Sequence, residues 1–239
     1  MSNHQERIIE INNLRYSYPD GTSALSGITL DVFEGISLGI IGSNGAGKST
    51  LLLHLIGILK GDGFIKILGL DMTDKNLSII RSKVGLVFQD PENQLFMPTI
   101  FDDVSFGPIN MGLNKSDVEA SVNRALKQVD LLSFTHRSPH HLSIGEKKRA
   151  AIATVLSMDP RILILDEPSS NLDPKHRRDL IGLLNNLTQT KIIATHDLNL
   201  VRETCSAVAL MYRGKIAAQG SAQAILDNRE LLEQYDMSA

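Results

Sequence analysis

The stretch from Gly42 to Thr50 reads Gly-Ser-Asn-Gly-Ala-Gly-Lys-Ser-Thr, which fills every fixed position of the phosphate-binding pattern G-x-x-x-x-G-K-[ST]. An apolar run over residues 36–41 precedes this loop, and a second apolar run over residues 51–56 follows it. The order predicts a short strand, a glycine loop and then a buried helix. The motif therefore predicts an α/β fold that holds a phosphate group between a strand and a helix.

The residue types of this loop suit a chain of phosphates. Glycine reaches backbone conformations closed to other residues, so several N–H groups can approach one anion, and the helix that follows adds its dipole. We expect Lys48 to reach the β- and γ-phosphates of a nucleotide and the Ser49 hydroxyl to hold Mg²⁺. The expected nucleotide-binding residues of the loop are Gly42, Ser43, Asn44, Gly45, Ala46, Gly47, Lys48, Ser49 and Thr50.

Composition narrows the classes of partner. The net charge of −3 over 239 residues gives no strong attraction to nucleic acid, so no nucleic-acid partner is expected. The single cysteine, Cys205, excludes an internal disulfide and suits a reducing compartment. The polar start lacks the apolar centre of a signal peptide, and no apolar run is long enough to cross a bilayer. A role at a membrane would need another chain as anchor.

Alternating apolar residues over 8–41 predict strands ahead of the phosphate loop, with a turn at 18–21. Tyr18 opens this turn and has two interpretations that the sequence supports equally. An aromatic ring ahead of a phosphate loop stacks on a nucleotide base, or it is an ordinary strand tyrosine in a core or at an edge.

Three further apolar segments that read as strands are each followed by polar side chains: Gln89, the pair Asp166 and Glu167, and His196. The carboxyl ends of parallel strands meet at one edge of a sheet, where ligands bind. We expect Asp166 to organise Mg²⁺ through its water shell and Glu167 to polarise an attacking water as general base. Gln89 is expected to contact Mg²⁺ or a water. The alternative is that these are solvated strand ends.

Residues 90–157 predict a largely helical subdomain inserted into an α/β core formed by about 1–89 and 158–239. Within this insertion, Ser143 is expected to cap a helix, with Glu146 at the capping-box position.

Sequence patterns predict a further helix, a hairpin and a final helix. A stripe of apolar residues predicts a helix over 115–132, capped by either Ser116 or Asn114, with Glu119 as the capping-box partner of Ser116. The pattern over residues 207–218 predicts a closing hairpin, and the pattern over residues 222–235 predicts one final helix.

Together these motifs resemble the nucleotide-binding subunit of ABC transporters over nearly the whole chain. The matches are to the Walker A loop at 42–49, the Q-loop at Gln89, the signature at 142–146, the Walker B pair Asp166-Glu167, the D-loop at 170–173 and the switch histidine His196. The resemblance implies a RecA-like P-loop NTPase core with an N-terminal antiparallel β region. It also implies ATP and Mg²⁺ as cofactors, with Glu167, His196 and Gln89 as the catalytic residues.

The resemblance also implies a head-to-tail dimer, made of two copies of this chain or of one copy and a paralogue. Each ATP would lie between the Walker A loop of one subunit and the signature of the other. Ser143 and the backbone around Gly145 would contact the γ-phosphate, and Asp173 would belong to the nucleotide site.

The segment after Gln89 resembles the energy-coupling-factor (ECF) branch of this family, which includes cobalt and nickel importers. That branch docks a membrane scaffold subunit on the corresponding segment, here about Asn93–Pro108. The implied function is a peripheral ATPase on the cytoplasmic face of the membrane, working with scaffold and substrate-binding subunits to import a transition-metal ion or a vitamin. Asp102 and Asp103 are either partners for basic residues of a coupling helix or incidental loop acids.

One residue departs from the family pattern, because Ile144 stands where the signature has its first glycine. A β-branched residue disfavours positive φ, so hydrolysis would be slowed if the site needs glycine there and unaffected if the backbone is helical. Two other functions stay open. One is a soluble ABC ATPase of an assembly machine of the iron–sulfur type, and the other is an ATP-binding chain that hydrolyses weakly beside an active paralogue.

Overall fold

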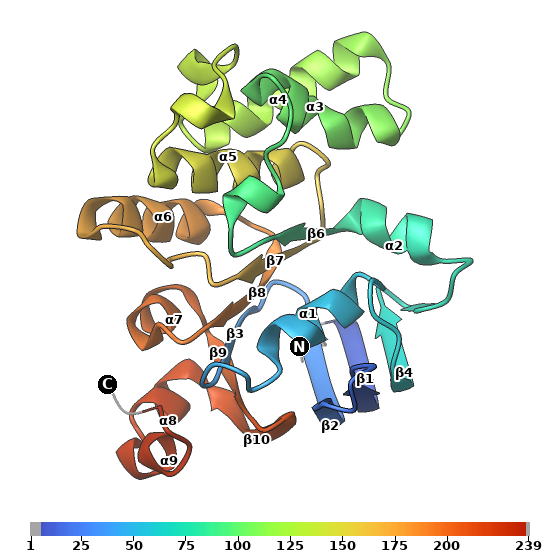
Figure 1. Ribbon diagram of the computed structural model, residues 1–239, viewed down its shortest axis with the longest axis vertical. Coiled ribbons are helices and arrows are strands. Elements are labelled where there is room, and N and C mark those ends of the chain that lie inside the picture. Colours follow the sequence, from blue (N-terminus) through green and yellow to red (C-terminus); the bar gives the residue numbers. More distant parts are fainter. Residues whose placement is uncertain (1–5, 238–239) are drawn as a thin grey trace, which may run out of the picture. The chain divides into compact units, whose positions relative to one another are not determined.

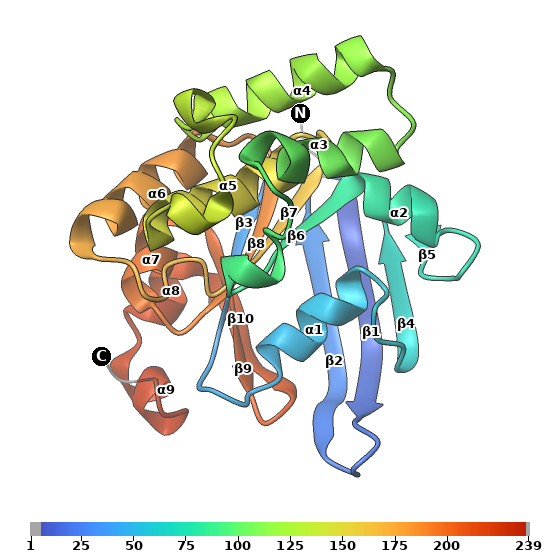
Figure 2. The same cartoon turned by 45° about the horizontal axis from the view of Figure 1, so that its top comes forward.

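The computed structural model describes residues 6–237. The chain forms two compact units, the first from Met1–Arg81 with Thr190–Ala239 and the second from Ser82–Gln189. Figures 1 and 2 trace the elements of each unit. Among the helices of the described range, none is long and apolar enough to span a membrane.

An antiparallel sheet occupies the N-terminal part of the first unit, as predicted. Its strand order is β2-β1-β4-β5, and residues of β2 alternate between core and solvent, with Ile28, Leu30 and Val32 buried. This period of two places one face of the sheet on the core. The strands are β1 (Arg7–Ser17), β2 (Ser23–Phe33), β4 (Asp62–Ile67) and β5 (Leu70–Asp71).

The first unit also holds the strands that flank the phosphate loop. β3 pairs in parallel with both β8 and β9, and β9 forms a hairpin with β10. β3 and β8 are almost wholly buried, which explains why they read as continuous apolar runs rather than alternating ones. The strands are β3 (Ser37–Ile41), β8 (Thr190–Thr195), β9 (Ala207–Tyr212) and β10 (Lys215–Ser221).

The helices of the first unit include one correction to the sequence-based prediction. The single helix predicted over 222–235 is wrong, because the chain forms two helices there. Asn228 begins the second of them, and its side-chain oxygen accepts a hydrogen bond from the Leu231 N–H at 3.0 Å. The helices are α1 (Lys48–Leu55), α7 (Leu198–Thr204), α8 (Ala222–Leu226) and α9 (Arg229–Gln234); α2 (Leu77–Lys83) runs into the second unit.

The second unit combines a parallel strand pair with a group of helices, of which α3, α4 and α5 pack together (Figure 2). It contains the predicted helical segment 90–157, and it also contains β6, β7 and α6, so the subdomain boundary stays a prediction. The elements are β6 (Val84–Val87), β7 (Ile162–Asp166), α3 (Ile100–Asn110), α4 (Lys115–Gln128), α5 (Ile144–Leu156), α6 (Pro174–Asn186) and 3₁₀ turns at Pro91–Asn93, Leu132–Phe134 and Pro139–His141.

The structure decides between the two predicted caps of α4. The Asn114 side-chain oxygen accepts a hydrogen bond from the Asp117 N–H at 3.0 Å, and the Ser116 hydroxyl donates to the same oxygen at 2.7 Å. Asn114 is therefore the cap, and Ser116 supports it from the first turn.

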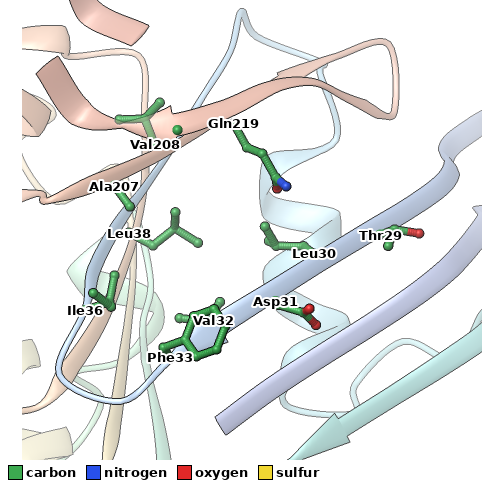
Figure 3. A pocket seen from close by; sticks show the side chains of 11 residues that line it. Thr29, Leu30, Asp31, Val32, Phe33, Ile36, Leu38, Ala207, Val208 and Gln219 are labelled. Atoms are coloured by element: carbon green, nitrogen blue, oxygen red, sulfur yellow. The ribbon is translucent and has the colours of Figure 1, made fainter. Parts of the chain in front are cut away.

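A pocket of about 480 Å³ lies within the first unit, beside β2, β9 and β10 (Figure 3). Leu30, Leu38 and Val208 give it apolar walls. Its lining residues include no member of the predicted nucleotide site, so we assign the pocket no part in nucleotide binding.

Candidate nucleotide site

The phosphate loop connects β3 to α1, and its glycines are required by close backbone approaches. Gly47 has a φ of +102°, and a Cβ there would lie 2.6 Å from the Ala24 carbonyl oxygen. A Cβ on Gly42 would lie 2.4 Å from the Met211 carbonyl oxygen. Side chains cannot fit at either position, so the loop is held in its fold by the neighbouring strands of the first unit.

The N-terminus of α1 differs from the N-termini of α3 to α9, because within the described range it has no side-chain cap. No side chain of the described residues caps α1, whose N-cap is Gly47. Each helix from α3 to α9 has a side-chain cap, supplied by Thr99, Asn114, Ser143, Asp173, Asp197, Ser221 and Asn228. The first N–H groups of a helix need an acceptor, and a phosphate is a fitting one. The bare end of α1 therefore suits an anion.

Lys48 places positive charge at the same loop. The residue is buried, and its Nζ donates to the carbonyl oxygens of Gly42 at 2.7 Å and Ser43 at 3.2 Å. These bonds hold the ammonium group beside the loop, while Asn44, Gly45 and Ser49 are exposed to solvent. An amide-rich loop with a lysine and an accessible hydroxyl fits a nucleotide phosphate with its Mg²⁺.

Tyr18 lies in the turn after β1 and belongs to a ring of contacts around Thr50. The Tyr18 and Thr50 hydroxyl oxygens are 2.9 Å apart. The Thr50 carbonyl lies 2.7 Å from Nδ1 of His54, so that nitrogen carries the proton. Burial lowers the pKa of His54, and the ring packs edge-on against Tyr16, which packs in turn on Tyr18. Tyr18 is thus fixed beside the phosphate loop, and stacking on a base stays a prediction.

His196 directly follows β8, the strand that pairs with β3 beside the phosphate loop. In the parallel pair, Ile41 of β3 lies opposite Thr195 of β8. Gly42 and His196 are the next residues of each strand, so both lie at the same end of this pair. His196 is exposed.

In the second unit, Gln89 and the two acids form a corresponding arrangement. Val87 of β6 lies opposite Leu165 of β7, so Gln89 and Glu167 each follow a paired residue by two positions. Gln89 is exposed, Asp166 is half-buried and Glu167 is buried. Glu167 has a φ of +43°, a left-handed conformation that costs free energy in residues other than glycine. Strain of this kind is typical of functional sites.

The segment after Glu167 is held by Lys148, a residue that the sequence analysis did not single out. Its Nζ donates to the carbonyl oxygens of Gln89 at 3.1 Å and Glu167 at 3.2 Å and to the Ser170 hydroxyl at 3.0 Å. Burial lowers the pKa of Lys148 to about 8, against the opposing effect of nearby carboxylates that include Asp90. Its spacing of four residues from Ile152 on the buried face of α5 was the available signal.

The signature begins α5 with the predicted capping box. The Ser143 hydroxyl and N–H both donate to Glu146, at 2.8 and 2.7 Å, and the Glu146 N–H donates to the Ser143 hydroxyl at 3.4 Å. Burial opposes ionisation of Glu146, but the bonds from Ser143 together with the charges of Arg149 and Arg137 outweigh it and lower the pKa of Glu146. Ile144 is the first helical residue, its φ is not positive, and its side chain is exposed. The backbone at this position is therefore helical without glycine.

Gly145 is needed for the packing of α5 against α6. A Cβ at this position would lie 2.5 Å from the ring of His176. Asp173 caps α6 through the N–H groups of Lys175 and His176, and its other oxygen lies 2.6 Å from Nδ1 of His176. These hydrogen bonds lower the pKa of Asp173. His176, a second residue missed from the sequence, thus joins the D-loop aspartate to the signature glycine.

The segment after Gln89 presents apolar side chains to solvent. Phe96 is 63% exposed and packs edge-on against Phe106, with 5.5 Å between ring centroids, and Ile109 is also exposed. We call Phe96, Phe106 and Ile109 the exposed strip. The prediction that Asp103 meets basic residues of a partner is wrong, because Asp103 is 3% exposed and accepts bonds from the N–H groups of Phe96 and Met97.

Comparison with known proteins agrees with these motifs. The sequence pattern of the family described as ABC transporter matches residues 25–170. The chain is 48% identical to the energy-coupling factor transporter ATP-binding protein EcfA of Carboxydothermus hydrogenoformans, over 97% of this chain and 87% of the relative.

Two solved structures are also similar. The structure of cbiO1 from Clostridium perfringens, part of the ABC transporter complex cbiONQ, has a TM-score of 0.86 and 38% identity, and covers 98% of this chain and 96% of that one. An ATP-binding cassette solved as a post-hydrolysis dimer with ADP and Pi has a TM-score of 0.81 and 27% identity, and covers 90% of this chain and 99% of that one. The chain therefore belongs to the family of ABC transporter ATP-binding proteins.

Proposed function

We propose that this ABC ATPase is the energy-coupling subunit of an ECF-type importer for a transition-metal ion, such as cobalt or nickel, or for a vitamin. It would act on the cytoplasmic face of the membrane with separate scaffold and substrate-binding subunits. The observation that carries the proposal is the exposed strip, because aromatic side chains open to solvent on a folded surface indicate a protein interface. The 48% identity to EcfA supports it.

The proposed roles in ATP hydrolysis follow from the chemistry of each side chain. Lys48 would bind the β- and γ-phosphates, and Glu167 would accept a proton from the attacking water. Ser49, Gln89 and Asp166 would hold Mg²⁺, with Asp166 acting through water. The metal, when bound, neutralises charge on the phosphates.

The remaining site residues would orient the reactants. Tyr18 would stack on the base, since its ring is fixed beside the loop by Thr50. His196 is proposed to contact the γ-phosphate region, and its exposed position supports this role. Asp173 is proposed to belong to the nucleotide site as part of the D-loop, where it caps α6.

A dimer would complete each site. Ser143 and the backbone at Gly145 would meet the γ-phosphate bound by a second cassette, which is either another copy or a paralogue. ATP would hold the two subunits together, and hydrolysis would release them, so the cycle would move the membrane subunits.

Co-purification tests the importer. The tagged chain is expressed in its native host, membranes are solubilised in mild detergent, and the proteins that accompany it are identified. We expect small integral membrane proteins, with Phe96→Asp abolishing their recovery because a charge would replace the most exposed ring of the strip.

The matched control is Leu132→Asp, which places the same charge at an apolar side chain that is 48% exposed outside the strip. It should leave the recovery of membrane proteins intact. Recovery of soluble partners alone, from a chain absent from membranes, would overturn the importer and favour an assembly machine. Equal recovery with Phe96→Asp would exclude the strip as the docking surface.

A further inference from the structure

Lys148 is a buried cation that no proposed step of ATP hydrolysis uses. Only 5% of the residue is exposed, although lysine is rarely buried without a specific set of partners. Its three oxygen partners come from three motifs: Gln89 of the Q-loop, Glu167 of the Walker B pair and Ser170 of the D-loop. The three donors of one ammonium group thus join segments that lie 59, 19 and 22 residues away in the chain.

The Glu167 carbonyl oxygen is the centre of this network. It accepts from Nζ of Lys148 at 3.2 Å, from the Ser170 hydroxyl at 2.9 Å and from the Ser170 N–H at 3.2 Å. The bond to the Ser170 N–H closes a turn directly after β7. Glu167 adopts its left-handed conformation inside this turn, and these donors stabilise that conformation against its steric cost.

The neighbouring lysine shows that the position matters, rather than the charge alone. Lys147 lies on the same helix, but its Nζ meets the exposed carboxylate of Glu92 at 2.6 Å. Because the Glu92 side chain is 66% exposed, solvent screens this pair and it contributes little to stability. Lys148 instead bonds to two backbone carbonyls and a hydroxyl inside the second unit, so its loss would free the backbone that carries Glu167.

We propose that Lys148 is a positioning residue for ATP hydrolysis, which aims the Glu167 carboxylate by fixing the Glu167 backbone and ties it to the Q-loop. The inference rests on the proposed role of Glu167 as general base. A general base must lie within hydrogen-bond reach of the proton that it takes, so a small shift of its backbone slows the chemical step. Lys148 itself makes no contact with the nucleotide in this scheme.

Steady-state kinetics of Lys148→Met tests this role, because methionine keeps much of the side-chain volume and removes every donor. We expect kcat to fall roughly 10-fold to 100-fold while KM and the Kd for ATP stay within about threefold. Lys148→Arg keeps the charge and the donors and should restore part of kcat. Lys147→Met is the matched control and should keep the turnover of the wild type.

Two outcomes would overturn the proposal: a kcat for Lys148→Met equal to that of Lys147→Met, or a KM that rises as much as kcat falls. Thermal unfolding and ATP binding report whether Lys148→Met folds. If it does not, Ser170→Ala removes one donor to the same carbonyl, and an unchanged kcat in Ser170→Ala would equally contradict the account.

Glu167→Gln separates this inference from the proposed function. Unchanged turnover in Glu167→Gln would exclude Glu167 as the general base, and the inference about Lys148 would then also be wrong. If Glu167→Gln is inactive while Lys148→Met is fully active, only the positioning role is wrong. If both roles hold, the double variant should be no slower than Glu167→Gln, because Lys148 acts through Glu167.

Discussion

The N-termini of α1 and α5 are both proposed to contact the phosphates of ATP, but of the two only the N-terminus of α5 has a side-chain cap within the described range. Gly47 begins α1 with no side-chain cap from the described residues, whereas Ser143 and Glu146 close the start of α5 with both bonds of a capping box. A side-chain cap contributes about 1 kcal/mol to a helix. The described part of the chain lacks this stabilisation where its own loop is proposed to bind phosphate, and has it where a second cassette is proposed to bring the phosphate.

From this difference we expect the two helix ends to act at different stages of the proposed cycle. The start of α1 has no side-chain cap from the described residues, and Lys48 already lies beside the loop. At α5, the Ser143 hydroxyl donates to Glu146, and the proposed contact with phosphate would require it to exchange that carboxylate for the phosphate. We therefore expect ATP binding to precede engagement of the signature.

The largest effect is expected from Gly47→Ala, which changes the uncapped N-terminus of α1. Its Cβ would overlap the Ala24 carbonyl at a φ of +102°, so we expect a loss of about 3 kcal/mol in the free energy of unfolding and no measurable ATP binding. Gly45→Ala is the control, because Gly45 also has a positive φ but faces open space, and it should cost about 1 kcal/mol. Urea unfolding and ATP titration measure both. Equal losses would show that the contact with Ala24 is unimportant.

The next largest effect is expected from Gly145→Ala, which disturbs the capped N-terminus of α5 through its contact with His176. The added methyl would press on the imidazole ring, and overpacking of this kind costs about 2 kcal/mol. His176→Ala removes the ring atoms, so Gly145→Ala should cost at least about 1 kcal/mol less in that background. A double-mutant cycle of thermal unfolding gives this coupling energy. Strict additivity would contradict the packing described for α5 and α6.

A smaller effect should come from Glu146→Gln. Glutamine can still complete the capping box, but the negative charge beside the proposed phosphate contact is gone. In a Glu167→Gln background, we expect ATP-dependent dimerisation to become roughly threefold to fivefold tighter. Sedimentation with ATP and Mg²⁺ measures the affinity, with the exposed Glu119→Gln as control. Weaker dimerisation would mean that Glu146 assists the phosphate contact.

The smallest effect is expected from Ile144→Gly, which restores the family signature. The backbone at Ile144 is already helical, so kcat should stay within about twofold, and glycine in place of isoleucine should cost the helix only about 0.5 kcal/mol. A large gain in steady-state turnover would show instead that isoleucine impairs the signature.

Local patterns made much of the fold predictable. The phosphate loop, its strand and helix, the antiparallel region and the capping box at Ser143 each depend on residues close together in the chain, and the structure has all of them. The break between α8 and α9 was missed because helical spacing continues across Asn228, although Asn228 is the N-cap that begins a new helix.

Residues whose role depends on distant contacts could not be recognised in this way. Lys148 and His176 look like ordinary charged and polar positions of helices in the sequence. Their contacts with Glu167 and Gly145 appear only in the folded chain. Asp103 gave the opposite error, because an acid in a polar stretch reads as exposed until its bonds to the Phe96 and Met97 amides are known.

The order of events at the two helix ends is tested most directly by separating ATP binding from dimerisation. Sedimentation and ATP titration are carried out on Glu167→Gln alone and with Lys48→Ala or Ser143→Ala added. The account predicts that Lys48→Ala abolishes both binding and dimerisation, whereas Ser143→Ala binds ATP with an unchanged Kd as a monomer and fails to dimerise. Loss of ATP binding in the Ser143→Ala monomer, or undiminished dimerisation, would contradict it.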